Sequence, residues 1–255
     1  MMINQNFRAD FEIHFHEVNP QEEAAPLTIL HFLEDTAIAH SQAVGFGVRQ
    51  LKEEGLAWIL NRWHLQMDHY PKLGETVAIE TWPSKFERFY ATREFFIRDS
   101  KQSVIGRASS LWIFYNILTK RPLRVRPEFQ EAYGLNIARA IENPFTSLES
   151  SLDGNGEEVA FSVRRSDIDT NGHVNNANYL QWILEAVPDH IYQDCYLSSL
   201  EIQYKKETTY GSKIRSYCKC DPAGALNYLG NHIILGEESG LELALAKTVW
   251  ESRPK

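Results

Sequence analysis

Several features that define large classes of protein are missing from this chain of 255 residues. No apolar run approaches the roughly 20 residues that a membrane-spanning helix needs, so we expect no membrane insertion. The amino terminus has neither the apolar core of a signal peptide nor the Ser- and Arg-rich character of a transit peptide. A net charge of -8 argues against nucleic acid as a partner, although it allows a local basic patch.

Cysteine is also scarce, with only three residues in the chain. We expect Cys218 and Cys220 to point to opposite faces of one strand and therefore not to pair. Free thiols suit a reducing cytoplasm, which is the location that we predict, and a homodimer is left open. The G-x-S-x-G signature of serine hydrolases is absent. His14 and His16 share one predicted strand face but lack the further ligands of a metal site, so we predict no metal and no cofactor.

What the chain does contain is one order of elements that occurs twice. In the first half, alternation predicts a strand at 11–18, helical periodicity a helix at 26–45, and apolar runs predict strands at 57–68, 75–82, 86–99 and 103–115. The second half repeats this order, with a strand at 159–165, a helix at 176–187 and strands at 197–206, 213–220, 227–235 and 241–250. Gly74 and Gly211 stand at matching places in the two halves. A duplicated unit is the simplest explanation.

One helix wrapped by a long antiparallel sheet is the hotdog arrangement. The fold class is therefore α+β, and we predict a tandem (double) hotdog in which each half is a long helix wrapped by an antiparallel β-sheet. The segment 137–155 is rich in Ser, Asn, Gly and Glu, as linkers are. We place an N-terminal hotdog domain at 1–145, a linker at 146–156 and a C-terminal hotdog domain at 157–255.

The approach to the second helix is unusually dense in polar side chains. It begins RRSDIDTNGHVNNANYL at 164–180. Asp169, Asn171 and His173 occupy alternate positions, so in an extended segment they would point the same way, as a polar comb. Asn175 or Asn176 can cap the helix, and the free N–H groups of its first turn suit a developing oxyanion. Both asparagines would serve equally well to satisfy the loop backbone.

The first repeat offers a comparison for this comb. Its aligned positions hold Asn19, Gln21 and Glu23, a different set of side chains beside an equivalent helix. If the fold alone required the comb, both copies would show it. The asymmetry predicts a single active site, in the second repeat.

Three ordered motifs resemble the acyl-acyl-carrier-protein (acyl-ACP) thioesterases of fatty acid synthesis: D-x-N-x-H-V-N-N, Y-L-x-W-I-L-E-x-V-P and I-x-Y-K-K-E-T. The resemblance covers nearly the whole chain, including the strand with Trp63 and the segment RPLRVRPEF at 121–129. It implies hydrolysis of the thioester between a fatty acyl chain and the phosphopantetheine arm of ACP, and a bacterial rather than a plastid form. It also implies a catalytic network of Asp169, Asn171, His173 and Glu207.

Glu207 ends a predicted strand, and Tyr70 is its counterpart in the first repeat. Relatives often carry cysteine after this glutamate, but this chain has Thr208, whose hydroxyl is a poor nucleophile without a dedicated base. We therefore expect carboxylate chemistry. Either Asp169 attacks the thioester carbonyl, the route that we favour, or Asp169 or Glu207 activates a water molecule. In both routes His173 would polarise the carbonyl or protonate the thiolate, and the asparagine of the comb would align the attacking group.

Substrate binding needs a long apolar slot and a cationic mouth. Because the first repeat lacks the comb, we assign the acyl slot to it. The candidate lining residues are Leu30, Leu33, Ala37, Trp58 and Ile59. The same residues would also suit ordinary core packing. The resemblance implies an acidic carrier protein and hence a basic docking site. Its candidates are Arg121, Arg124, Arg126, Lys205 and Lys206. Charge runs are commonly no more than a solvated face.

Other functions share part of this pattern. Hydrolysis of acyl-CoA uses the same chemistry with a different handle on the thioester. A non-catalytic hotdog protein that binds acyl ligands would not need four catalytic side chains together. A hotdog dehydratase would use a histidine and a carboxylate contributed across paired hotdogs, which the D-x-N-x-H comb argues against. Thiol release from ACP and CoA thioesters of varied chain length separates these alternatives.

Overall fold

The computed structural model of this chain describes residues 6–148, 156–169, 172–224 and 227–253. The chain forms two compact units, Met1–Pro144 and Phe145–Lys255. The sequence placed the linker between the domains at 146–156, and most of this predicted linker, together with Asn171 of the comb, lies outside the described residues. No helix formed by the described residues is long and apolar enough to cross a membrane.

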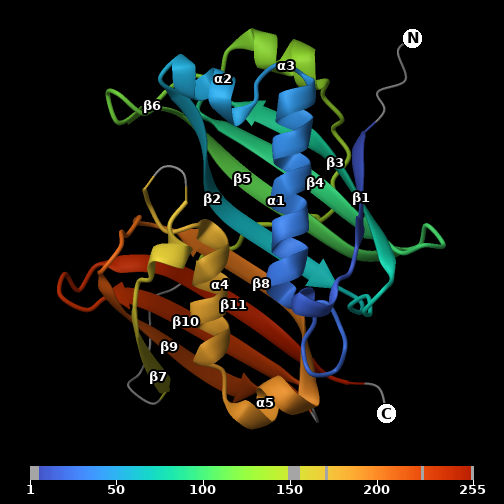
Figure 1. The fold of residues 1–255 in the computed structure, drawn as a ribbon, viewed down its shortest axis with the longest axis vertical. Coiled ribbons are helices and arrows are strands. Elements are labelled where there is room, and N and C mark those ends of the chain that lie inside the picture. Colours follow the sequence, from blue (N-terminus) through green and yellow to red (C-terminus); the bar gives the residue numbers. More distant parts are fainter. Residues whose placement is uncertain (1–5, 149–155, 170–171, 225–226, 254–255) are drawn as a thin grey trace. The chain divides into compact units, whose positions relative to one another are not determined.

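The first unit is a long helix laid against an antiparallel sheet (Figure 1). Helix α1 (Pro26–Ala43) starts at a proline, which suits the first turn because the missing N–H would have no helical partner there. The strands lie in the order β1-β3-β4-β5-β2, and β6 pairs with β5. Their bounds are β1 (Phe7–Glu12), β2 (Leu56–Met67), β3 (Thr76–Glu87), β4 (Tyr90–Arg98), β5 (Val104–Asn116) and β6 (Arg121–Pro122).

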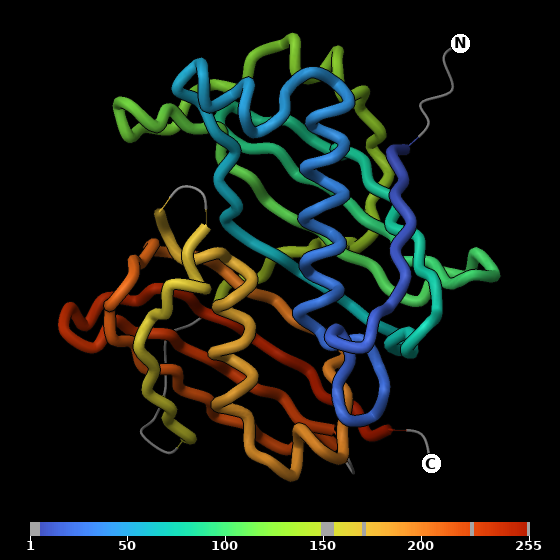
Figure 2. The backbone as a smooth tube through the Cα atoms, viewed as in Figure 1, coloured from blue at the N-terminus to red at the C-terminus, as the bar shows by residue number. Residues whose placement is uncertain are grey.

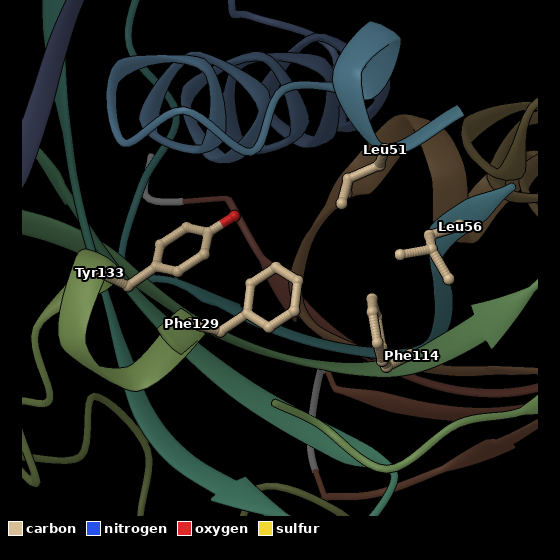
Figure 3. Packing of buried hydrophobic residues seen from close by; sticks show 5 residues of the cluster. All are labelled: Leu51, Leu56, Phe114, Phe129 and Tyr133. Carbon is tan, nitrogen blue, oxygen red and sulfur yellow. The ribbon is translucent and has the colours of Figure 1, made fainter. Parts of the chain in front are cut away.

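The core of the first unit has two parts. The buried face of α1 carries Ile29, Leu30, Leu33 and Ala37, which recur at helical spacing and are at most 4% exposed. A second cluster is closed by two short helices, α2 (Val48–Glu53) and α3 (Pro127–Tyr133). Figure 3 shows the rings that α3 contributes facing Leu51, Leu56 and Phe114 across this cluster. Neither short helix is predicted by the sequence, because six or seven residues carry too little periodicity.

The second unit repeats the same plan. Its strand order is β7-β9-β10-β11-β8, which matches the first unit strand for strand. Figure 2 traces strand, helix and then strands in both units, from blue to green in the first and from yellow to red in the second. The elements are β7 (Glu157–Ser162), α4 (Asn176–Glu185), α5 (Asp189–Asp194), β8 (Cys195–Tyr204), β9 (Lys213–Pro222), β10 (Tyr228–Gly236) and β11 (Glu242–Ser252).

Individual backbone hydrogen bonds repeat as well. The Gly74 N–H donates to Ile13 O at 2.9 Å, and the Gly211 N–H donates to Val163 O at 3.2 Å. Each acceptor residue donates in turn to the residue after the glycine. Both glycines have φ near +80°, the left-handed conformation in which a side chain is strained. The predicted tandem of two helix-and-sheet units is confirmed.

Two boundary predictions are wrong. The first strand lies at β1 rather than at 11–18, because a 3₁₀ turn, η1 (Phe15–Glu17), follows it. The turn closes when Glu17 Oε2 accepts the His14 N–H at 2.8 Å, and it leaves Phe15 82% exposed. The second error is at Pro83, where a strand end was predicted. Strand β3 instead runs on to Glu87 through a bulge next to Pro83, where the missing N–H is tolerated.

The cysteine prediction is corrected too. Cys218 and Cys220 stand two residues apart on β9, and side chains at that spacing share one face of a strand. Their Sγ atoms lie 3.2 Å apart, on the same side as His232 of β10. The two thiols are nevertheless not joined by a disulfide, and Cys195 forms no disulfide either.

Candidate functional site

The approach to α4 is a closed turn and not the extended comb that the sequence predicted. A single 3₁₀ turn, η2 (Arg165–Asp167), leaves β7, and Asp167 Oδ2 accepts the Arg164 N–H at 2.7 Å. Ile168 and Val174 then pair as an antiparallel bridge. Asp169 and His173 are therefore brought together by a turn, because backbone pairing at its neck folds the segment back on itself.

Asp169 and His173 face each other across the neck of this turn. The Asp169 N–H donates to His173 O at 2.8 Å, and the His173 N–H donates to Asp169 Oδ1 at 3.3 Å. Gly172 closes the tip by donating to Asp169 O at 3.1 Å, with φ at +83°. The Asp169 carboxylate thus orients the backbone that carries the histidine.

Glu207 completes the group. It lies just after β8, and its Oε2 is 3.2 Å from His173 Nδ1. The two segments are tied together by the Val174 N–H, which donates to Thr208 O at 3.0 Å. The His173 side chain is 39% exposed and that of Glu207 69%, so the pair is open to a ligand from outside. A contact this exposed contributes little to stability, so stability does not explain its presence.

The amino terminus of α4 lies beside the turn. Asn175 is the N-cap: its Oδ1 accepts the Ala177 N–H at 2.9 Å, so one of the two predicted caps is confirmed. Asn176 is the first helical residue, and its carbonyl accepts the Tyr204 hydroxyl at 3.1 Å. The partial positive charge of this helix end is suited to a developing oxyanion.

Two residues that sequence reasoning missed hold the turn against the helix. Asp167 is only 9% exposed, and its carbonyl accepts both the Asn175 N–H at 2.8 Å and Asn178 Nδ2 at 3.0 Å. In the first unit Glu17 O accepts the Ala25 N–H at 2.8 Å and the Thr28 hydroxyl at 2.9 Å. The matching helix positions, Asn178 and Thr28, are both polar, and this shared polarity was the available signal.

The equivalent loop of the first unit has the same backbone and different side chains. The Asn19 N–H donates to Glu23 O at 2.8 Å, and the Glu23 N–H donates to Asn19 Oδ1 at 3.0 Å. Glu22 takes the left-handed position of Gly172, with φ at +59°. The Ala24 N–H donates to Pro71 O at 2.8 Å. Asn19 and Glu23 therefore stand where the second unit has its aspartate and histidine.

The candidates for the acyl slot do not lie together. Leu30, Leu33 and Ala37 lie on the buried face of α1, and the two leucines are fully buried. Trp58 packs in the cluster of Figure 3, with its ring centroid 5.0 Å from that of Phe114. Ile59 is 37% exposed and contributes least to the interior.

The basic candidates divide into paired and unpaired residues. Arg126 contacts Glu54 at 3.2 Å and Glu128 at 3.0 Å, and Lys205 Nζ lies 2.6 Å from Glu242 Oε2. Arg121, Arg124 and Lys206 are exposed, and none of them forms an ion pair within the described residues. The described residues also contain no cluster of three metal-ligating side chains.

Comparison with known proteins adds an independent observation. Residues 4–133 match the family described as the acyl-ACP thioesterase N-terminal domain, and residues 150–252 match its C-terminal domain. A dodecanoyl-acyl-carrier-protein hydrolase of Cinnamomum camphora is 32% identical over 98% of this chain and 68% of its own. The structure of a 12:0-ACP thioesterase from Umbellularia californica is 27% identical, covers 97% of this chain and 94% of that one, and superposes with a TM-score of 0.87. A structure described as a putative oleoyl thioesterase of Lactobacillus plantarum superposes with a TM-score of 0.90, and the superposition covers 99% of this chain and 99% of that one. At 22% identity this likeness shows the shared fold.

Proposed function

This chain belongs to the acyl-ACP thioesterase family, and from that premise we propose that the turn at 169–173 and Glu207 form its active site. The chain is a thioester hydrolase that releases fatty acid from acyl-ACP, the step that ends elongation in fatty acid biosynthesis. Its substrate therefore presents three groups to the site: the acyl chain, the thioester carbonyl and the phosphopantetheine thiol.

One observation carries the proposed site. The two units fold the same loop with the same backbone hydrogen bonds, yet at the matching positions only the second unit has a histidine facing a carboxylate, with His173 Nδ1 3.2 Å from Glu207 Oε2. In the first unit these positions hold Glu23 and Tyr70. The contact of His14 Nδ1 with Glu17 Oε2 in the first unit, also at 3.2 Å, lies at the η1 turn before the loop. Because the backbone is conserved between the units without the pair, folding does not require His173 and Glu207. A role in the reaction explains why they occur together.

The pair is arranged for proton transfer. Glu207 lies on the Nδ1 side of His173, which orients the ring and leaves Nε2 for the substrate. His173 can then polarise the thioester carbonyl or protonate the departing thiolate, while the first turn of α4 stabilises the oxyanion. Asn175 and Asn176 contribute to substrate binding through that turn. Two routes to the acyl carbon fit this arrangement: direct attack by Asp169, or attack by water that a carboxylate has activated.

A thiol or hydroxyl nucleophile fits the site poorly. Thr208 is 9% exposed, and its carbonyl serves the loop by accepting the Val174 N–H. Cys195 is buried, and burial raises the pKa of its thiol, which disfavours the reactive thiolate. The carboxylate routes are therefore favoured, and Asn171 is assigned to aligning the attacking group.

The remaining assignments complete the proposal. We assign acyl-chain binding to the first unit, catalysis to the second, and docking of the acidic carrier to the unpaired cations Arg121, Arg124 and Lys206. Lys205 and Arg126 are weaker docking candidates than the sequence suggested, because each already has a carboxylate partner. Three cysteines without a disulfide support a cytoplasmic location.

Thioester hydrolysis by purified protein tests the proposal. ACP and CoA thioesters of varied chain length are supplied, and free thiol is followed with time for the wild type and for His173→Ala. The proposed site is supported if the wild type hydrolyses acyl-ACP and the His173→Ala variant does not. Equal turnover of CoA thioesters would identify a general acyl thioesterase, and full activity of His173→Ala would place the active site elsewhere.

A further inference from the structure

Tyr179 of α4 lies directly beneath the segment that carries Glu207. Its side chain is 2% exposed and packs edge-on against Tyr204, with ring centroids 5.5 Å apart. Its hydroxyl donates to Lys206 O at 3.3 Å. The hydroxyl is therefore bonded to the residue that directly precedes Glu207.

The same short segment is tied to the histidine. Thr208 O accepts the N–H of Val174, the residue that follows His173. On the opposite side, the Lys206 N–H donates to Leu243 O at 3.2 Å. The helix, the segment 206–208 and the catalytic loop thus form one hydrogen-bonded unit, in which the Tyr179 hydroxyl joins the helix to the segment 206–208.

The hydroxyl is suited to holding this segment at working pH. Burial raises the pKa of Tyr179 above its usual range, and the nearby Glu207 carboxylate raises it further. The group therefore remains a protonated donor throughout the pH range in which the enzyme would work.

The first unit provides an internal comparison. Helices α1 and α4 begin at Pro26 and Asn176, so the fourth residue of each is Ile29 or Tyr179. The unit that has Tyr70 in place of Glu207 thus has an aliphatic side chain, without a hydroxyl, at this helix position. The fold accepts an apolar residue here, and the hydroxyl occurs in the unit that has the histidine–carboxylate pair.

We propose that Tyr179 is a positioning residue of the thioesterase site: its hydroxyl fixes the segment 206–208 so that the Glu207 carboxylate meets His173. This proposal rests on the proposed catalytic role of that pair. A buried tyrosine that merely satisfies a carbonyl would affect stability alone. A positioning tyrosine also affects the chemical step, and it does so only through Glu207.

A double-mutant cycle with Tyr179→Phe and Glu207→Gln tests this role. Tyr179→Phe keeps the ring and removes only the hydroxyl, so we expect kcat for acyl-ACP to fall about 3- to 10-fold, the range that one hydrogen bond supports, with KM nearly unchanged. In the Glu207→Gln background the same change should cause almost no further loss, because the carboxylate that it positions is gone. The matched control is Tyr196→Phe, which removes a hydroxyl bonded to Glu251 Oε2 at 3.1 Å at the far end of β8.

The outcomes separate this proposal from the proposed function. Glu207→Gln with wild-type kcat would refute the catalytic role of Glu207 and the positioning role with it. A large loss in Glu207→Gln combined with unchanged kcat in Tyr179→Phe would refute the positioning role alone. Full additivity of the two losses would also refute it, as would a kcat loss in Tyr196→Phe equal to that in Tyr179→Phe. Melting temperatures of all variants identify any loss that comes from unfolding.

Discussion

Replacing Asp169 by asparagine should remove most turnover while leaving the catalytic loop folded. The first unit already shows that asparagine fits this position, because Asn19 Oδ1 accepts the Gln21 and Glu23 N–H groups, each at 3.0 Å, in the equivalent loop. An amide oxygen at 169 can likewise accept the His173 N–H, which now donates to Asp169 Oδ1 at 3.3 Å. The substitution therefore changes the charge and the chemistry at 169 and keeps the backbone pairing.

The two effects differ greatly in size. A hydrogen bond to a charged acceptor contributes about 1 kcal/mol more to stability than one to a neutral acceptor. A loss of about 1 kcal/mol lowers the melting temperature of a chain of this size by about 2–4 °C. An amide is a poor nucleophile and a poor base, so we expect kcat to fall about 10²–10⁴-fold on either route. That fall corresponds to about 2.7–5.4 kcal/mol in the activation barrier.

The assay is thiol release from acyl-ACP, measured beside thermal unfolding. Asn19→Asp in the first unit is the matched control and should leave kcat unchanged. An Asp169→Asn enzyme within threefold of wild type would refute the catalytic assignment. A melting temperature lowered by more than about 10 °C, well beyond the loss of one hydrogen bond, would refute the reasoning from Asn19.

A single turnover in heavy-oxygen water, with enzyme in excess, then separates the two routes. If Asp169 attacks the thioester and water opens the anhydride at the aspartyl carbon, the label enters Asp169 and the first fatty acid carries a light oxygen. If a carboxylate activates water, the label enters the fatty acid directly and Asp169 stays light.

Three further measurements test other parts of the account. Glu23→Ala in the first unit should leave turnover within a few-fold while His173→Ala abolishes it, and equal losses would refute a single active site. Thr208→Ala should keep most activity, since Thr208 contacts the catalytic loop through its backbone carbonyl. Inactivation by a thiol reagent, prevented by substrate, would instead implicate a cysteine. Arg124→Glu should raise KM for acyl-ACP far more than for a short pantetheine thioester. The difference should shrink as added salt screens charges more than about 8–10 Å apart. Equal effects on the two substrates would show that Arg124 belongs to an ordinary solvated surface and not to a docking site.

The pH dependence of stability gives a fourth. Burial lowers the pKa of His232 from 6.5 to about 3, so below pH 6.5 the unfolded chain binds a proton that the folded chain does not. Above pH 6.5 this histidine is neutral in both states, so it gives the free energy of unfolding no pH dependence. Between pH 6.5 and 3 it lowers the free energy of unfolding by about 1.4 kcal/mol for each unit that the pH falls. The His232→Met variant should therefore lose less stability on acidification than the wild type, and parallel unfolding curves for the two would contradict the expected neutral histidine.

Local patterns were enough to predict the order of the elements and their duplication. Alternation and helical spacing are properties of neighbouring residues, so α1, α4 and the long strands are predicted to within a few residues. The asymmetry between the repeats also follows from the chain alone, because aligned loops can be compared position by position. Short helices, the bulge next to Pro83 and the shared face of Cys218 and Cys220 were missed or misread. Six-residue helices lack periodicity, and the cysteine spacing was interpreted with the wrong strand geometry.

The sequence by itself determined that Asp169 and His173 stand in one polar segment before a helix, and that Glu207 follows closely on a strand. Only the tertiary structure decided how they meet. A left-handed residue at Gly172 and the pairing of Ile168 with Val174 fold the segment into a turn. The bond from Val174 to Thr208 then brings in a strand end that is distant in the chain. Such contacts depend on which backbone groups pair across the fold, and the spacing of residue types along a chain does not encode that pairing.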